Sequence, residues 1–258
     1  MHHDAVEGWA HILRDLDEDI RFVADLKSGL HGWRSVRPGG RTILAMSSFL
    51  LLLIAVMLWL LLGVAALLHR ARHPHDGAAA RAVLEGRPLD PIEAGLDGHD
   101  AFTHASDGRD IPLWMVHGAG SGPPRVLIHD WSESPVTMLP RAIEVAGDVS
   151  LVLIPCLRGH DRCAGPSTLG ALETSDVRRM IETCSDGPVH IEGYGLGGLI
   201  ARRLEGDACV ASIQVIDQWR DARDGLGRIM TMQGFPRWPI VSLAMLVFRG
   251  FSADTSST

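Results

Sequence analysis

The segment with the clearest chemical potential is a glycine-rich run in the C-terminal third of the chain. Residues 189–201 (VHIEGYGLGGLIA) begin with alternating apolar positions, pass through several glycines and end in a helical pattern. A strand that turns sharply into a helix presents backbone N–H groups that attract anions. Such a turn serves one of two chemistries: it cradles the phosphates of a dinucleotide, or it presents a nucleophilic side chain for acyl transfer.

The dinucleotide interpretation depends on the glycine spacing alone. Gly193, Gly195 and Gly198 satisfy the G-x-G-x-x-G pattern. That loop normally follows the first strand of its domain, and an acidic residue ends the next strand. Here the run follows several predicted strands, and Asp217 is the only late candidate for the acid. The order of elements disfavours a dinucleotide site, so no cofactor is expected.

The same run resembles the nucleophile elbow of α/β-hydrolases, Gly-x-Ser-x-Gly followed by a further glycine. Residues 125–131 resemble the strand and oxyanion loop of that family, and residues 157–161 (LRGHD) resemble its Arg-Gly-His-Gly loop. Residues 168–177 resemble the segment that leads into a helix in its membrane-anchored and peptidase-like branches. Residues 217–251 resemble the segment after its sixth strand. The resemblance covers roughly 100–252 and implies a mostly parallel sheet with flanking helices.

Two groups of residues correspond on this resemblance to catalytic machinery. They are the elbow (Gly193, Tyr194, Gly195, Leu196 and Gly197) and the oxyanion loop (His129, Asp130 and Trp131), in which Asp130 stands where glycine is usual. The family's serine falls at Gly195, which has no side chain to attack a substrate. No histidine follows His190, although the family places its catalytic histidine last. The chain also stops before the family's last two strands. We expect a degenerate, truncated hydrolase scaffold with no catalytic residue.

Two other uses of this region stay open. Cys163 and His160 have the residue types of a thiol nucleophile and its base, which would make the protein a divergent hydrolase or transferase. Alternatively, the backbone N–H groups of Leu196 and Trp131 bind a small anion or carbonyl without turnover, as in a ligand-sensing module. The cysteine spacing demands no disulfide, so free buried thiols are the default.

A membrane anchor precedes the globular part. Residues 42–68 carry no charge and form a helix of about 40 Å at roughly 1.5 Å per residue, enough to cross a bilayer core. The run starts too late and is too long for a signal peptide. It contains no haem ligand or proton relay. Trp59 lies well inside it and is expected to pack against a partner. The flanking arginines are nearly balanced, with a weak preference for a cytoplasmic N-terminus.

The N-terminal segment, residues 1–41, contains an amphipathic helical pattern. Its apolar stripe is formed by Trp9, Leu13, Leu16, Ile20 and Val23, and the opposite face is acidic. A stripe with a period near 3.5 residues suits a partner helix, although packing on the chain's own globular domain fits equally well. The acidic face disfavours anionic lipid.

A connector, residues 69–97, joins the anchor to the α/β domain, residues 98–258. Its cluster of His69, His73, His75 and Asp76 lacks a matching cysteine or carboxylate pair, so no metal site is expected. Short apolar runs then alternate with helical ones, which is typical of a parallel sheet covered on both faces. The predicted strands are 111–116, 125–129, 149–154, 189–192 and 211–216, and the predicted helices are 135–146, 172–184, 196–205 and 221–230.

If the last two strands of the family are missing, strand 211–216 lies at an open sheet edge. The apolar run 239–248 is too short to span a bilayer. It covers that edge, lies on the membrane surface or packs against another subunit.

These expectations combine into one functional prediction. A net charge of −7 excludes a nucleic-acid partner, and Lys27 is the lone lysine among 24 basic residues, which is typical of a GC-rich genome. The sequence predicts a single-pass protein of a bacterial inner membrane that contacts lipid and other integral-membrane subunits through its transmembrane and N-terminal helices. Its expected role is that of a non-catalytic accessory subunit.

Overall fold

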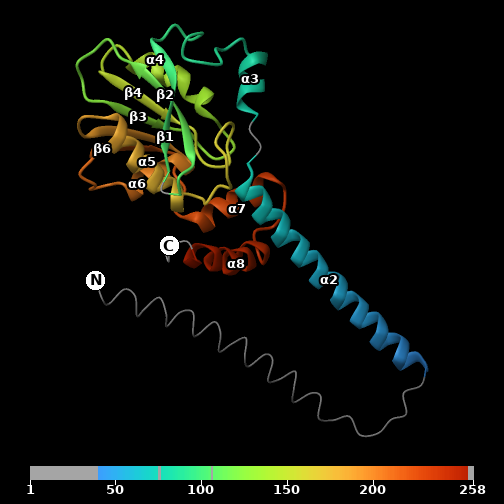
Figure 1. Cartoon of the computed structure of the whole chain (residues 1–258). Helices are drawn as coiled ribbons and strands as arrows, with labels where there is room; N and C mark the ends of the chain where they lie inside the picture. The colour runs from blue at the N-terminus through green and yellow to red at the C-terminus, as the bar shows by residue number, and fades with distance from the viewer. Residues whose placement is uncertain (1–39, 75–76, 106, 255–258) are drawn as a thin grey trace. The chain divides into compact units, whose positions relative to one another are not determined.

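The computed structural model describes residues 40–74, 77–105 and 107–254, and it divides the chain into two units, Met1–Met57 and Leu58–Thr258. The predicted amphipathic stripe, Trp9 to Val23, lies outside the described residues, as do His75 and Asp76 of the histidine cluster. The second unit holds all of the sheet (Figure 1).

A single helix contains the predicted anchor. Helix α2, Gly40–Arg72, is long and apolar enough to cross a membrane. Within Ser47–Arg72 the most apolar stretch has a mean hydropathy of 3.0, and only 11% of it is buried inside the protein. Trp59, expected to pack against a partner, is 49% exposed in the described part of the chain. An apolar helix surface of this extent needs lipid or protein around it.

The sheet has six strands in the order β1-β2-β4-β3-β5-β6. The strands are β1 (Gly98–His104), β2 (Asp110–His117), β3 (Arg125–Ile128), β4 (Leu151–Pro155), β5 (Val189–Tyr194) and β6 (Val210–Ile216). The four strands β4, β3, β5 and β6 are parallel, whereas β2 pairs antiparallel with both β4 and β1. The mostly parallel α/β sheet predicted from the sequence is therefore confirmed.

Helices cover both faces of this sheet (Figure 1). Helices α5 (Ala171–Cys184) and α6 (Leu196–Arg203) lie on one face, and the 3₁₀ turn η2 (Pro135–Met138) and α4 (Leu139–Val145) lie on the other. The remaining helices are α3 (Ala78–Leu84), α7 (Ala222–Met232) and α8 (Ile240–Asp254). Val126 and Ile128 of β3 face the core that includes α5, α6 and α7, while Leu127 faces α4. Alternation along a buried strand produces this three-layer packing.

Two elements lie where the sequence predicted other features. Strand β1 was not predicted, and α3 lies within the segment predicted as a connector. Strand β1 is mostly exposed, so its sequence lacks the apolar alternation that marks a half-buried strand. Only its pairing with β2 makes it a strand.

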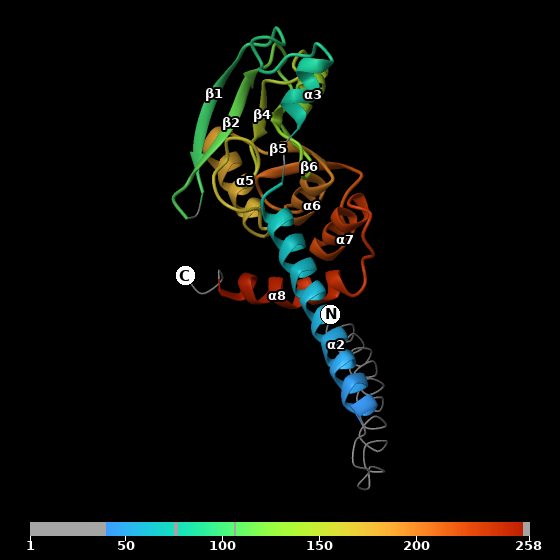
Figure 2. The ribbon, with the colours of Figure 1, turned by 90° about the vertical axis from the view of Figure 1, so that its right-hand side faces the viewer.

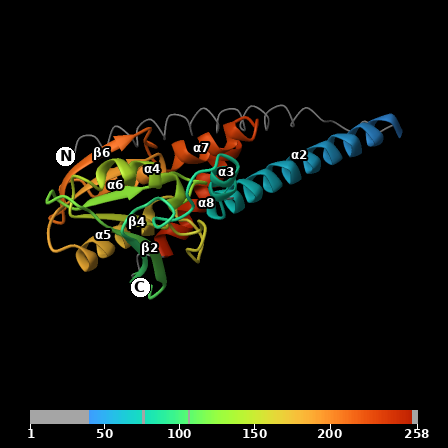
Figure 3. The same cartoon turned by 90° about the horizontal axis from the view of Figure 1, so that it is seen from above.

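The C-terminal apolar run forms helix α8. Strand β6 is an end strand of the sheet, as predicted. In the part of the chain that the structure describes, α8 packs beside α7 and the last turns of α2 rather than along β6 (Figures 2 and 3). The buried residues of this run belong to the same core cluster as residues of α7 and α2, and the three alternatives given by the sequence stay predictions.

Candidate functional site

The glycine elbow has the backbone shape expected of a nucleophile turn. Strand β5 ends at Tyr194, and α6 begins at Leu196, so Gly195 alone makes the turn, with φ 49° and ψ −107°. A Cβ on Gly193 would overlap the Gly197 carbonyl, and a Cβ on Gly197 would overlap the Ile128 carbonyl. Both positions require glycine because the backbone of β3, β5 and α6 converges there.

The space beside Gly195 is filled by the carboxylate of Asp130. A Cβ built on Gly195 would overlap all three terminal atoms of the Asp130 side chain. Asp130 follows β3, the central neighbour of β5, and therefore reaches the elbow from the adjacent strand. A side chain at residue 195 and the observed position of the Asp130 carboxylate are mutually exclusive.

One oxygen of Asp130 accepts two backbone hydrogen bonds. The amide N–H groups of Trp131 and Leu196 both donate to Asp130 Oδ1, each at 2.6 Å. In hydrolases with this turn, the oxyanion hole is made by the N–H of the residue after the nucleophile and an N–H from the loop after β3. Leu196 and Trp131 hold those two positions. Asp130 Oδ1 thus engages both N–H donors of this turn.

Burial makes this carboxylate a weak acid. It raises the pKa of Asp130 to about 6, against the two N–H donors, which favour the charged form and lower the pKa. The carboxylates of Glu133 and Asp217 add a smaller increase. Near neutral pH the protein therefore holds an internal anion at the N-terminus of α6, where the helix dipole stabilises it.

The two histidines of the neighbouring loops form hydrogen bonds with main-chain groups. His129 Nδ1 lies 2.8 Å from the Asp130 carbonyl, and its Nε2 accepts a hydrogen bond from Leu157 N–H. His160 does the same between the Arg158 carbonyl and the Ser132 N–H. Burial, helped by the neighbouring His160, lowers the pKa of His129 to about 3, so this ring is neutral. Both rings fix the shape of the Asp130 loop.

Cys163 and His160, the thiol and base suggested by the sequence, are both buried. Cys163 is 5% exposed and clusters with Cys156, Ala105 and Ile111. The hydrogen bond with Cys163, together with burial, raises the pKa of Cys156, and the same contact lowers that of Cys163. The ring nitrogens of His160 are engaged by the main chain. Cys163 is therefore a buried thiol beside Cys156, and the described contacts of the His160 ring are with main-chain groups.

The Tyr194 side chain packs on the face of the sheet that α4 covers, opposite to the face covered by α6. This is expected for its position in the elbow. Its hydroxyl donates to Glu192 Oε1 at 2.7 Å, and burial raises its pKa to about 12. Glu192 also accepts from Arg141 Nε at 2.8 Å. Glu192 therefore pairs with Arg141, and the Tyr194 hydroxyl is a hydrogen-bond donor to this ion pair.

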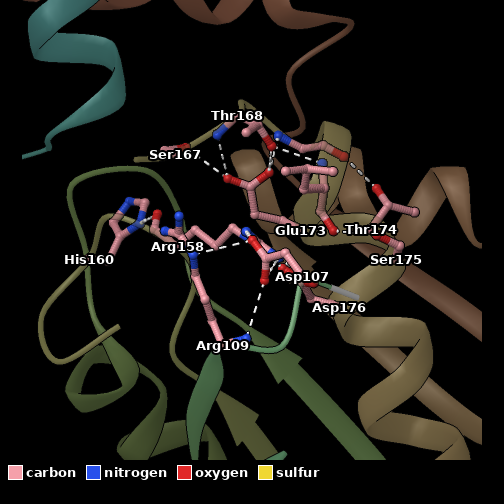
Figure 4. A network of polar contacts seen from close by, with 12 residues as sticks. Asp107, Arg109, Arg158, His160, Ser167, Thr168, Glu173, Thr174, Ser175 and Asp176 are labelled. Carbon is pink, nitrogen blue, oxygen red and sulfur yellow. Dashed lines mark hydrogen bonds and ion pairs between the residues drawn. The ribbon is translucent and has the colours of Figure 1, made fainter. Parts of the chain in front are cut away.

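Residues 157–176 form a structural network (Figure 4). The guanidinium of Arg158 donates to the carboxylates of Asp176 and Asp107, and the hydrogen bonds to Asp176 raise the Arg158 pKa further. Glu173 accepts from Thr168 N–H and Gly170 N–H, which caps the start of α5. Arg158 and Glu173 therefore tie loops to α5.

A pocket of about 410 Å³ opens beside Asp130. Its walls include Trp131, Trp219, Arg70 at the end of α2 and Arg228 on α7. The indole of Trp131 donates to the Ala71 carbonyl at 3.1 Å. One wall of the pocket is therefore attached directly to the last turn of α2. No signal in the sequence pointed to Arg70 or Arg228, which lie far apart along the chain.

Comparisons with known proteins identify the fold. No protein-family model matches the sequence, and no curated protein matches it. Among solved structures, the Pyrococcus furiosus esterase Pf2001 is similar in two crystal forms, at 16% identity in both, with TM-scores of 0.53 and 0.51. The matches cover 67% and 70% of this chain, and 66% and 67% of the esterase. An α/β hydrolase from Novosphingobium aromaticivorans is 21% identical over 46% of this chain and 44% of its own, with a TM-score of 0.42.

Proposed function

We propose that this chain, which has an α/β-hydrolase fold, is a non-catalytic, membrane-anchored accessory or structural subunit of an integral-membrane complex. The observation that carries the proposal is the Asp130 carboxylate in the oxyanion position beside Gly195. A bound internal anion occupies the site that a reacting carbonyl oxygen needs. The residue that turns the elbow has no atom that attacks a carbonyl.

The anchor supports the second part of the proposal. Helix α2 exposes a long apolar surface that carries Phe49, Leu53 and Trp59. We assign it as a single span of a bacterial inner membrane, with the N-terminus on the cytoplasmic side. Because the described part of the helix offers packing surface and no reactive group, we assign it to contacts with lipid and neighbouring helices.

Two measurements on the full chain in mild detergent test this function. A fluorophosphonate probe and a thiol-reactive probe are applied first, and short-chain ester hydrolysis is assayed in parallel. We expect no fluorophosphonate adduct and no turnover. Turnover that disappears in Cys163→Ala would establish the rival thiol enzyme and refute the non-catalytic assignment.

The second measurement tests the subunit role. A photo-crosslinking amino acid replaces Trp59 in cells, and the matched control carries it at Leu84, an exposed residue of α3. We expect one crosslinked membrane protein of defined mass from residue 59 and none from residue 84. Migration of the purified protein as a lone monomer, with no adduct at residue 59, would contradict the proposal.

Ligand sensing is the second candidate, favoured by the link between pocket and anchor. Trp131 lines the pocket beside Asp130 and also donates to the Ala71 carbonyl of α2. A ligand that displaces the Asp130 carboxylate would therefore move a group bonded to the anchor. The test is a thermal-shift screen of small carboxylates and esters, in which a stabilising compound must lose its effect in Gly195→Val.

A further inference from the structure

The first part of helix α8, residues 240–248, is apolar on both its inner and its outer face. Ile240, Val241 and Ala244 are buried in the core, whereas Leu246 is 68% exposed. Leu243 and Val247 are exposed on the same outer side. No charged residue occurs between positions 239 and 248. A helix that is apolar all round requires an apolar environment on its outer side as well.

The segment before α8 also exposes apolar side chains. Met232 ends α7, and Phe235 and Trp238 lie in the turn between the two helices. All three side chains are exposed, and Trp238 is 78% exposed. We call Met232, Phe235, Trp238, Leu243, Leu246 and Val247 the α8 face. Large apolar side chains exposed in one short stretch of chain mark an interaction surface.

Contacts with α2 fix the depth of this face along the anchor. Ile240 packs against Gly63, where an added Cβ would come within 2.9 Å of Ile240 Cδ1. Val64 and Leu67 of α2 belong to the same core cluster as Val241 and Ala244 of α8. In Figures 2 and 3, α8 lies crosswise beside this end of α2. The two helices therefore meet inside the uncharged run 42–68.

That position corresponds to the edge of a bilayer. Gly63 precedes the end of the uncharged run at Leu68 by about 8 Å at roughly 1.5 Å per residue. Amphipathic helices that lie in the membrane plane place their apolar face about 5–10 Å into the boundary between headgroups and acyl chains. If α2 spans the membrane, α8 is held at this depth by its contacts with α2.

Arginines flank the α8 face on the side of α7. Arg220, Arg223 and Arg237 line a groove of about 380 Å³ between α7 and α8, together with Trp238. Arg223 also donates to Ser242 Oγ at 3.1 Å. Asp221 and Asp224 line the same groove, but Asp221 caps α7 and Asp224 pairs with Arg228. Guanidinium groups beside an interfacial tryptophan suit the phosphates of lipid headgroups.

We propose that the α8 face is a second membrane contact, inserted into the interfacial region of the leaflet through which α2 leaves the bilayer. This inference rests on the proposed membrane span of α2. The occupant of the face is lipid: acyl chains contact Leu243, Leu246 and Val247, and headgroup phosphates contact the flanking arginines. The α/β unit thus contacts the membrane at two places, through α2 and through the α8 face, and not through α2 alone.

Depth-dependent fluorescence quenching tests this proposal. The full chain, with Cys184→Ser and Cys209→Ser, is purified in mild detergent and reconstituted into vesicles of phosphatidylcholine and phosphatidylglycerol. A single nitrobenzoxadiazole label is placed at Leu246→Cys, with Val247→Cys as an independent second site. Leu84→Cys is the matched control, because Leu84 is an exposed leucine on α3. Leu53→Cys reports on the anchor.

We expect the labels at residues 246 and 247 to be quenched severalfold more than the label at residue 84 by lipids with a nitroxide near the headgroup. The label at residue 53 should respond best to nitroxides near the chain ends. Quenching at 53 without quenching at 246 and 247 would overturn the α8 proposal and leave the anchor intact. Blue-shifted but unquenched emission at 246 would also overturn it, because a polypeptide would then cover the face. An unquenched label at 53 would refute the anchor itself.

Discussion

Replacing Asp130 by asparagine isolates the energetic effect of the buried carboxylate. Asparagine keeps a side-chain oxygen for the two N–H groups of Trp131 and Leu196 but removes the ionisable proton. The pKa of Asp130 is raised from 3.8 to about 6 by burial. An acid whose pKa is higher in the folded than in the unfolded state binds protons on folding. Its protonation stabilises the fold fully below about pH 4, and this stabilisation is lost as the pH rises to about 6.

The magnitude follows from the size of the pKa difference. A rise from 3.8 to about 6 corresponds to about 3 kcal/mol of folding free energy at 1.36 kcal/mol per pH unit. Asp130→Asn should therefore be more stable than the wild type at pH 7.5 by up to about 3 kcal/mol, or roughly 6–12 °C in Tm. The advantage should shrink below pH 6 and vanish near pH 4.

The assay is thermal unfolding of the full chain in mild detergent between pH 4 and 8, compared pairwise with the wild type. The difference between the two proteins cancels the titration of Glu133 and Asp217, which both retain. Asp130→Ala is the control: it also lacks the ionisable proton but leaves two N–H groups without an acceptor, so it should be less stable than Asp130→Asn by about 1–3 kcal/mol for each at every pH. The reasoning is refuted if Asp130→Asn is less stable than the wild type at pH 7.5 and equal to it at pH 4. That result would mean that the hydrogen bonds outweigh burial.

Three further substitutions test other parts of the site. Gly195→Ser places a side chain at a positive φ and against the Asp130 carboxylate. It should lower the free energy of unfolding in urea by about 1–3 kcal/mol, and the added Asp130→Gly change should restore stability. The Gly195→Ser variant should not react with a fluorophosphonate. Arg158→Met leaves the carboxylates of Asp107 and Asp176 without their cation, and that of Asp176 is buried. It should lower the free energy of unfolding by about 3–5 kcal/mol in the same measurement, whereas a loss near zero would mean that the ion pair is not formed. Trp131→Phe removes the hydrogen bond to the Ala71 carbonyl and should lower the free energy of unfolding by about 1 kcal/mol, while the fluorescence spectrum shows that the fold is kept. An unchanged free energy of unfolding would contradict the link between the pocket wall and α2.

Much of the scaffold was predictable because it depends on short-range patterns. The apolar runs of β2, β3, β4 and β5 alternate or are continuous over a few residues, so they identify buried strands directly. The predicted helix 135–146 appears as η2 followed by α4, a division that matches the prolines at 135 and 140. Strand β1 was not predictable because its polar residues show no period and its conformation depends on pairing with β2.

The sequence predicted where the candidate site lies but not which side chain fills it. The spacing of Gly193 and Gly197 identifies the elbow because only glycine permits that approach of backbone to backbone. Asp130 was recognised as a departure from the expected loop. That its carboxylate reaches the N–H of Leu196 could not be deduced, because 66 residues separate the two groups along the chain.

The amino-acid sequence by itself determined the uncharged apolar helix, the sharp glycine turn and the absence of a reactive atom at residue 195, since each is a property of residue type and local conformation. The tertiary structure decided what fills the turn, where α8 lies and which groups the histidines and Arg158 hold. The physical reason is that hydrogen bonding and burial depend on which distant segments the sheet brings together. Strand β3 delivers Asp130 to the elbow only because β3 and β5 are neighbours in the sheet.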